Sequence, residues 1–131
     1  MTIRTPAEVF RSVILTRATQ LGYTVYVNHM QDAPDKAIVV VDERGLLDQR
    51  TLRDTQTAQD RVEVQVRAKD HVDAGNVLPT LWEDVLRHVS ATSTYGGIVQ
   101  CITKANTMGC MGQEPQTRRW RFNQAFFMVI S

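Results

Sequence analysis

Three arginines near the C-terminal end of the chain come closest to a recognisable binding chemistry. Arg118, Arg119 and Arg121 are interleaved with the aromatic residues Trp120 and Phe122. Guanidinium groups alternating with aromatic rings are typical of surfaces that bind single-stranded nucleic acid. On an extended strand, however, Arg118 shares a face with Trp120, while Arg119 and Arg121 share the opposite face. We therefore interpret the cluster as a solvated or subunit-facing edge of a strand, with an oligonucleotide-binding module as the less favoured alternative.

The histidines have no spacing that is typical of a catalytic or metal site. His29, His71 and His88 form neither an HxxxH nor an HExxH pair, which are the arrangements that place two metal ligands on one helix face. Asp32 and Asp35 follow His29, but acids near a histidine are common in loops. Nucleophile-elbow, Walker and GxGxxG motifs are also absent from the sequence. We therefore predict no enzymatic activity, no cofactor and no metal, and keep a small hydrolase using His29 or His71 as the alternative.

Composition limits the classes of protein to which the chain can belong. It has 131 residues and a formal net charge of +1, whereas dedicated nucleic-acid binders are usually strongly basic. No apolar run approaches the ~20 residues of a membrane span, and the N-terminus lacks the apolar centre of a signal peptide. Cys101 and Cys110 match no zinc spacing, so we expect unpaired thiols in a reducing compartment. We therefore expect one domain, made in the cytoplasm, that does not enter a membrane.

The elements that must position these residues centre on the stretch from Asp60 to Val89. Apolar and charged residues alternate from Arg61 to Lys69, which predicts a strand with one apolar and one charged face. Apolar residues then recur every three or four positions, which predicts a helix. Pro79 interrupts this segment, and we favour a single helix from about His71 that is kinked at the proline over a new helix capped by Asn76.

Local signals predict the remaining elements. Thr5, Pro6 and Glu8 are typical of a capped helix start, and Gly22 of its end. Alternation and β-branched residues predict four more strands. These strands span residues 23–28, 37–43, 98–106 and 116–130. The expected order is helix, three strands, helix and two strands, with a loop over residues 107–115. We predict an α+β fold, in which a mixed, mainly antiparallel sheet of about five strands is backed by two helices.

Residues 44–59 form an unusually long connection with little periodicity. Such connections in compact domains are usually functional or mobile. Its leucines either pack on the domain's own core or belong to an arm that becomes ordered against a neighbouring subunit. Our hypothesis is the arm, with apolar contacts from the leucines and polar contacts from two arginines. The residues concerned are Leu46, Leu47, Arg50, Leu52 and Arg53.

Taken together, this succession of elements resembles the tail terminator proteins of long, non-contractile-tailed bacteriophages, a group also called minor tail or minor capsid proteins. The resemblance covers nearly the whole chain and is greatest over Val62–Leu86 and Gly112–Val129. In the second stretch, five residues match the family's closing strand. They are Gly112, Glu114, Arg119, Phe122 and Asn123. The likeness is a pattern and not a catalytic signature, and it assigns no role to the two cysteines or to the basic cluster as a whole.

The resemblance implies a structural protein of the virion with an α+β fold. Members of the family assemble as hexameric rings that cap the tail tube at its head-proximal end, stop its growth and join the connector or neck of the head. DNA passes through such a ring without specific binding. The expected partners are therefore further copies of the chain, the tail tube protein and the head connector or neck protein. A head-side neck or stopper (head completion) protein is the alternative within the same assembly.

Overall fold

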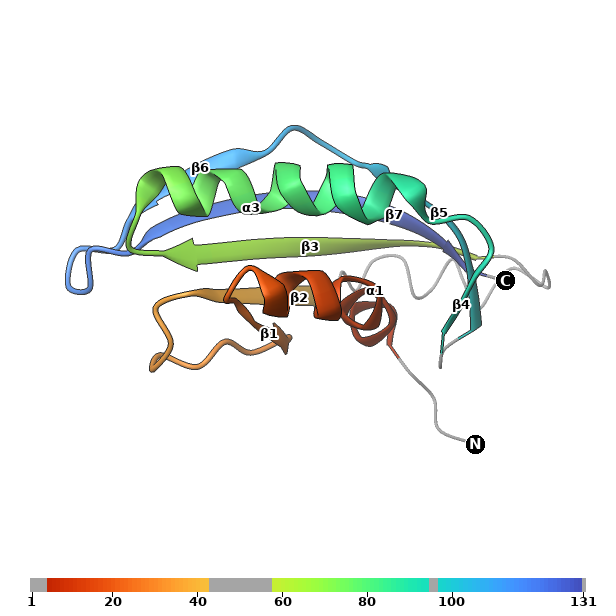
Figure 1. Cartoon of the computed structure of the whole chain (residues 1–131), viewed down its shortest axis with the longest axis horizontal. Helices are drawn as coiled ribbons and strands as arrows, with labels where there is room; N and C mark the ends of the chain where they lie inside the picture. Colours follow the sequence, from red (N-terminus) through yellow and green to blue (C-terminus); the bar gives the residue numbers. More distant parts are fainter. Residues whose placement is uncertain (1–4, 43–57, 95–96, 131) are drawn as a thin grey trace.

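The computed structural model describes residues 5–42, 58–94 and 97–130. Within these ranges, one sheet carries two α-helices on the same face (Figure 1). The helices are α1 (Pro6–Gln20) and α3 (His71–Asp84), and α3 is followed by the short 3-10 helix η2 (Leu86–His88). The strands are β1 (Thr24–Val27), β2 (Ala37–Asp42), β3 (Ala58–Ala68), β4 (Thr92–Thr94), β5 (Gly97–Lys104), β6 (Gly109–Gln113) and β7 (Trp120–Ile130). The predicted α+β fold is confirmed, although the sheet is larger than expected.

The sheet is built around its two long strands, β3 and β7. They pair antiparallel in one unbroken register from Ala58 opposite Ile130 to Ala68 opposite Trp120. The strand order is β1-β2-β3-β7-β5-β4, and β6 also pairs with β7. Strands β5 and β6 lie one after the other along the same edge of β7, because β5 pairs with its second half and β6 with its first. Only β1 and β2 are parallel among the described pairs, so the sheet is mixed and mainly antiparallel.

Both helices begin where the sequence predicts. The Thr5 side chain accepts a hydrogen bond from the Glu8 N–H, Pro6 occupies the first turn, and Gly22 follows the helix at φ +88°. Asp70 caps α3 by accepting from the Val72 N–H. Helix α3 runs through Pro79 as one element. The choice of a single helix over a new start at Asn76 is therefore confirmed. The predicted continuation of the helix to Val89 is wrong, because α3 ends at Asp84 and the 3-10 helix η2 follows it.

The core lies between the helices and the apolar face of the sheet. The predicted alternation of β3 is confirmed, since Val62, Val64 and Val66 are fully buried. The apolar face of β7 meets the same helices. It consists of Trp120, Phe122, Phe126, Met128 and Ile130, of which all but Trp120 are buried. Leu81 and Leu86 are also buried in this core, whereas Trp82 is half-buried at its margin and stacks on Phe126 with ring centroids 6.3 Å apart.

The C-terminal part of the chain differs from the predicted pattern. The predicted loop 107–115 contains β6, and the final strand begins at Trp120 instead of Gln116. The sequence pattern did not predict β6, because Gly109 and Gly112 have weak strand propensity. The strand is held by its pairing with β7. The chain reverses between β6 and β7 through Arg118 at φ +59°. The short strand β4 was likewise not predicted, and it is held by its pairing with β5.

The central connection and its flanking strands also differ slightly from the prediction. Strand β2 ends at Asp42 and β3 begins at Ala58, so the last two residues assigned to the 44–59 loop belong to a strand. Leu46, Leu47, Arg50, Leu52 and Arg53 lie outside the described residues. Strand β2 lies between β1 and β3, and its first four residues are buried. Side chains of successive residues point to opposite faces, so this strand is covered on both faces.

Candidate functional site

A polar array covers the face of the sheet that points away from the helices. It is formed by the side chains of β3 and β7 that alternate with the core residues. Arg121 donates to the Gln65 Oε1 at 2.7 Å, and Asn123 donates to the Glu63 Oε1 at 2.9 Å. Each bond is diagonal, because Asn123 lies directly opposite Gln65 and Arg121 directly opposite Arg67. The array therefore ties the two central strands together on the face that lacks the helices.

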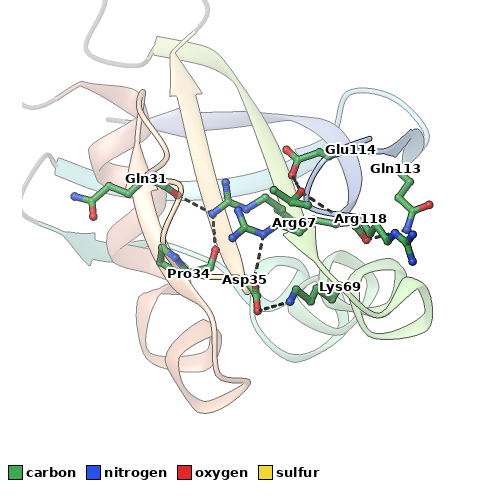
Figure 2. A network of polar contacts seen from close by, with 10 residues as sticks. Gln31, Pro34, Asp35, Arg67, Lys69, Gln113, Glu114 and Arg118 are labelled. Atoms are coloured by element: carbon green, nitrogen blue, oxygen red, sulfur yellow. Dashed lines mark hydrogen bonds and ion pairs between the residues drawn. The ribbon is translucent and has the colours of Figure 1, made fainter.

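One end of this array is a network centred on two buried arginines (Figure 2). We call it the arginine network and define it as Arg67, Arg119 and Arg121 with Lys69, Asp35 and Glu114. Arg67 is only 2% exposed, and its Nη2 donates to the backbone carbonyls of Gln31 at 2.6 Å and Pro34 at 2.5 Å. Burial, followed by the nearby positive charge of Arg119, lowers the pKa of Arg67.

The backbone explains why a buried arginine is needed at this position. Strands β1 and β2 run parallel but are joined by residues 28–36 alone, whereas parallel strands usually require a longer crossover that contains a helix. A short connection of this kind leaves backbone carbonyls without partners in regular structure. Arg67 satisfies two of them from the neighbouring strand β3. Its position on the mostly charged face of β3 follows from the alternation, but its burial does not.

Arg119 connects the same crossover to the β6–β7 turn. Its Nε lies 3.0 Å from the Asp35 Oδ1, and the Lys69 Nζ lies 3.6 Å from the Asp35 Oδ2. Asp35 therefore joins two cations from different strand ends, as Figure 2 shows for Lys69. Arg121 approaches the Glu114 Oε2 at 3.8 Å. Among the described residues, the buried cations of this network each have a polar partner from a distant part of the chain.

The β6–β7 turn is closed by its own hydrogen bonds. The Glu114 N–H donates to the Arg119 carbonyl at 2.8 Å, and the Arg118 N–H donates to the Glu114 carbonyl at 2.9 Å. The Thr117 hydroxyl donates to the Glu114 Oε1 at 2.6 Å, and the Gln113 side chain donates to the Arg118 carbonyl at 2.9 Å. The turn lies beyond the N-terminal end of α3 (Figure 1), so it is a projecting and internally braced part of the molecule.

The structure separates the three arginines that the sequence placed in one cluster. Arg119 and Arg121 are engaged within the chain, whereas Arg118 is exposed in the turn and precedes β7. Trp120 does not form an open stacking surface, because the His71 ring packs edge-on against it at 4.6 Å between centroids. The arrangement thus leaves few of the cations and rings free to hold a nucleic-acid strand. Asp35 and Arg67 were missed as members of this network because their partners are distant in sequence.

The remaining reactive side chains do not assemble a recognisable catalytic centre in the described part of the chain. No group of three or more histidine, cysteine or carboxylate residues is placed there to hold a metal. Cys101 and Cys110 are exposed free thiols on β5 and β6. Burial, with a smaller contribution from the Asp73 carboxylate, raises the pKa of Tyr23, which makes this phenol a weaker acid and disfavours it as a proton donor.

Comparison of the sequence with models of known protein families gives no match, and comparison with curated proteins gives none either. No helix in the described part of the chain is long and apolar enough to cross a membrane.

Proposed function

We propose that the chain is a structural protein of a phage virion that forms a hexameric ring on the head-proximal end of the tail tube. In this role the ring ends tube growth and presents the surface that joins the head connector or neck protein. DNA passes through the ring without specific binding. The subunit is made in the host cytoplasm and resides in the tail of the virion. Complementary protein surfaces perform this function, so it requires no catalytic residue, cofactor or metal.

One observation carries the proposal. The two stretches that most resemble tail terminators, residues 62–86 and 112–129, meet in the centre of the fold as β3 with α3 and as the β6–β7 hairpin. Two of the matching residues also have identifiable structural roles in that hairpin. Gly112 has φ +95° at an irregularity in β6, and Phe122 lies beneath α3 with its ring 3.4 Å from the position of a Gly75 Cβ. The resemblance thus follows one contiguous structural unit instead of scattered positions.

The charge distribution is compatible with a ring around DNA. The arginines of the central strands are largely neutralised or held by partners within the chain. A lumen that must let DNA pass would be obstructed by a continuous row of free cations, because phosphate contacts make binding tight at low salt. The exposed Arg118 in the projecting turn is the cation of the original cluster that remains most accessible.

The decisive experiment is to count copies on isolated tails. We expect the protein at the head-proximal end only, in six copies for each tail, and we expect tails assembled without it to be over-long and unable to join heads. Five or twelve copies would contradict the hexameric ring. Binding of the purified protein to DNA-filled heads, with none to tail tubes, would instead assign it to the head-side neck or stopper role.

A further inference from the structure

A groove of about 670 Å³ runs between α1 and the outer edge of β1. Its walls combine apolar side chains with one carboxylate and one guanidinium, so the groove has no net charge. Its lining includes Glu8, Arg11, Ser12, Leu15, Val25 and Val27. Strand β1 is the first strand in the sheet order and has no second strand partner among the described residues. The groove therefore lies beside an open edge of the sheet.

The register of the parallel pair shows which backbone groups face this groove. The Thr24 N–H donates to the Lys36 carbonyl, and the Asn28 N–H donates to the Val40 carbonyl. In a parallel pair, alternate residues bond to the same neighbour, so the N–H and C=O groups of Val25 and Val27 point to the open edge. The Val25 carbonyl accepts from the Arg11 Nε at 3.1 Å, and the Val27 carbonyl from the His29 N–H at 2.7 Å. The edge consequently presents two N–H donors to an added strand.

A second open edge is formed by β6, on the opposite side of the sheet from β1. Among the described strands β6 pairs with β7 alone. Charged side chains and prolines usually protect an edge strand from pairing with another chain. The residues of β6, Gly109–Gln113, include neither. Met111 is the additional residue between Cys110, opposite Phe122, and Gly112, opposite Arg121. This irregularity leaves the Met111 side chain 50% exposed.

We propose that the β6 edge of one copy of the chain adds to the β1 edge of the next copy, with Met111 entering the groove beside α1. An uncharged strand suits a groove whose two charges balance, and an exposed thioether suits a wall that contains Leu15, Val25 and Val27. The two edges differ and lie at opposite sides of one sheet, so the contact is head-to-tail. Such a contact leaves one edge of each kind open until a ring closes. The inference rests on the proposed ring and specifies how its subunits meet.

The size of the edges predicts a weak contact between two free copies. Strand β1 has four residues and β6 has five, with an irregularity that shortens the regular part. This pairing buries far less than the ~800 Å² on each partner that is typical of stable complexes. In a closed ring every copy uses both edges, and dissociation of one subunit requires two contacts to break together. The contact should therefore be transient in solution and persistent in the ring.

Cysteine cross-linking tests the contact directly, because β6 already carries the exposed thiol of Cys110. In a Cys101→Ser background, Ser12→Cys places a second thiol in the groove, and Gln20→Cys places it on the same helix outside the groove. A short bismaleimide should yield a ladder of linked subunits with Ser12→Cys, at least tenfold more than with Gln20→Cys. Equal linkage from both positions, or no linkage from Ser12→Cys at the highest soluble concentration, would overturn the proposal.

A substitution series separates this inference from the proposed function. Met111→Lys places a charge on the β6 edge and should reduce the Ser12→Cys linkage at least tenfold. Val72→Lys is the matched control, because Val72 is an apolar residue, 65% exposed, on α3 and outside both edges. Hexamers on tails without the Cys110 linkage would refute the edge contact while leaving the ring intact. Cross-linked copies that are absent from tail ends would refute the ring and retain the contact.

Discussion

Individual charged residues in this fold act mainly on the protein's own backbone and on each other. Arg67 satisfies carbonyls of the short β1–β2 crossover, and Asp35 joins Arg119 to Lys69. Asp42 does a comparable task at the other end of the molecule, where its Oδ1 accepts from the Ala7 N–H at the start of α1 at 2.7 Å. A carboxylate at this position also complements the helix dipole. Substitutions of these charged residues should therefore act mainly on the stability of the fold.

Replacing Arg67 with leucine should destabilise the protein by about 2–3 kcal/mol. The variant removes two hydrogen bonds from a charged donor to the Gln31 and Pro34 carbonyls, and hydrogen bonds of charged groups contribute about 1.5–3 kcal/mol. Relief of repulsion from Arg119 offsets part of that loss. Urea denaturation measures the difference. Arg87→Leu is the control, because Arg87 lies at the surface in an i,i+4 pair with Glu83, and it should cost less than about 0.5 kcal/mol. Equal losses would contradict the anchoring role of Arg67.

The raised pKa of Tyr23 predicts a specific loss of stability in alkali. Burial and the Asp73 carboxylate keep the phenol protonated in the folded state, while an unfolded tyrosine ionises at about pH 10. Stability is unaffected below that pH and falls above it, by up to about 1.4 kcal/mol per pH unit. Tyr23→Phe should remove this component of the pH dependence in denaturation measured from pH 8 to 11. Tyr26→Phe, in the adjoining strand β1, should retain it; an unchanged slope in Tyr23→Phe would refute the assignment.

At the scale of elements, the β5–β6 edge of the sheet explains most of the irregular structure. Strand β5 leaves β7 after Lys104, and β6 rejoins it at Gly109. Within this interruption Asn106 replaces the missing ladder bonds, since its Oδ1 accepts from the Ala125 N–H and its carbonyl accepts from the Gln124 side chain, both at 2.9 Å. One asparagine thus allows the strand to bend without leaving buried groups of β7 unpaired.

Two glycines on either side of β7 should respond oppositely to alanine. A Cβ at Gly75 in α3 would meet the Phe122 ring at 3.4 Å, which is an ordinary contact, so Gly75→Ala should stabilise the protein by about 0.5–1 kcal/mol through helix propensity. Gly112 has φ +95° with no atom near its missing Cβ. Gly112→Ala should therefore destabilise by about 1–2 kcal/mol through backbone strain alone. Thermal unfolding of both variants checks the opposite signs, and a shared sign would show that one of these local accounts is wrong.

For the molecule as a whole, the helices and the polar array divide the sheet into two unlike faces. The face under α1 and α3 holds the core, and the opposite face holds the strand-to-strand hydrogen bonds. The projecting β6–β7 turn and the open edges of β1 and β6 lie around the rim of this body. Such a shape is suited to lateral contacts between copies, which is the arrangement that a capping ring requires.

The arm hypothesis concerns contacts between copies of the chain. Its residues lie outside the described part of the chain. If the arm hypothesis is correct, replacing Leu46 and Leu47 with serine should change the free energy of unfolding of the free subunit by less than about 0.5 kcal/mol. The same variant should cap tails poorly and give over-long tails. Val72→Ser, which removes an exposed apolar side chain from α3, should cap normally. Strong protection of residues 44–57 from hydrogen exchange in the isolated subunit would instead assign the leucines to the core.

The sequence alone determined those features that depend on neighbouring residues. Alternation from Arg61 to Lys69 defines the two faces of β3, and the capping residues Thr5, Pro6 and Glu8 define where α1 begins. Both patterns have a short period, so they can be read from a few consecutive residues without knowledge of the fold. The assignment of α+β architecture followed from the same local signals.

Only the tertiary structure decided the features that depend on distant partners. Asp35 and Arg119 are separated by 84 residues, and Arg67 lies 33 residues from Pro34, whose carbonyl it binds. Strand β6 likewise is a strand because β7 lies beside it, despite glycines that locally disfavour an extended strand. Arg67 and Arg119, which the sequence suggests are surface cations, are buried and bind groups within the chain. Their environment is set by the parallel β1–β2 crossover and the β6–β7 turn, because these bring together groups that have no relation in sequence.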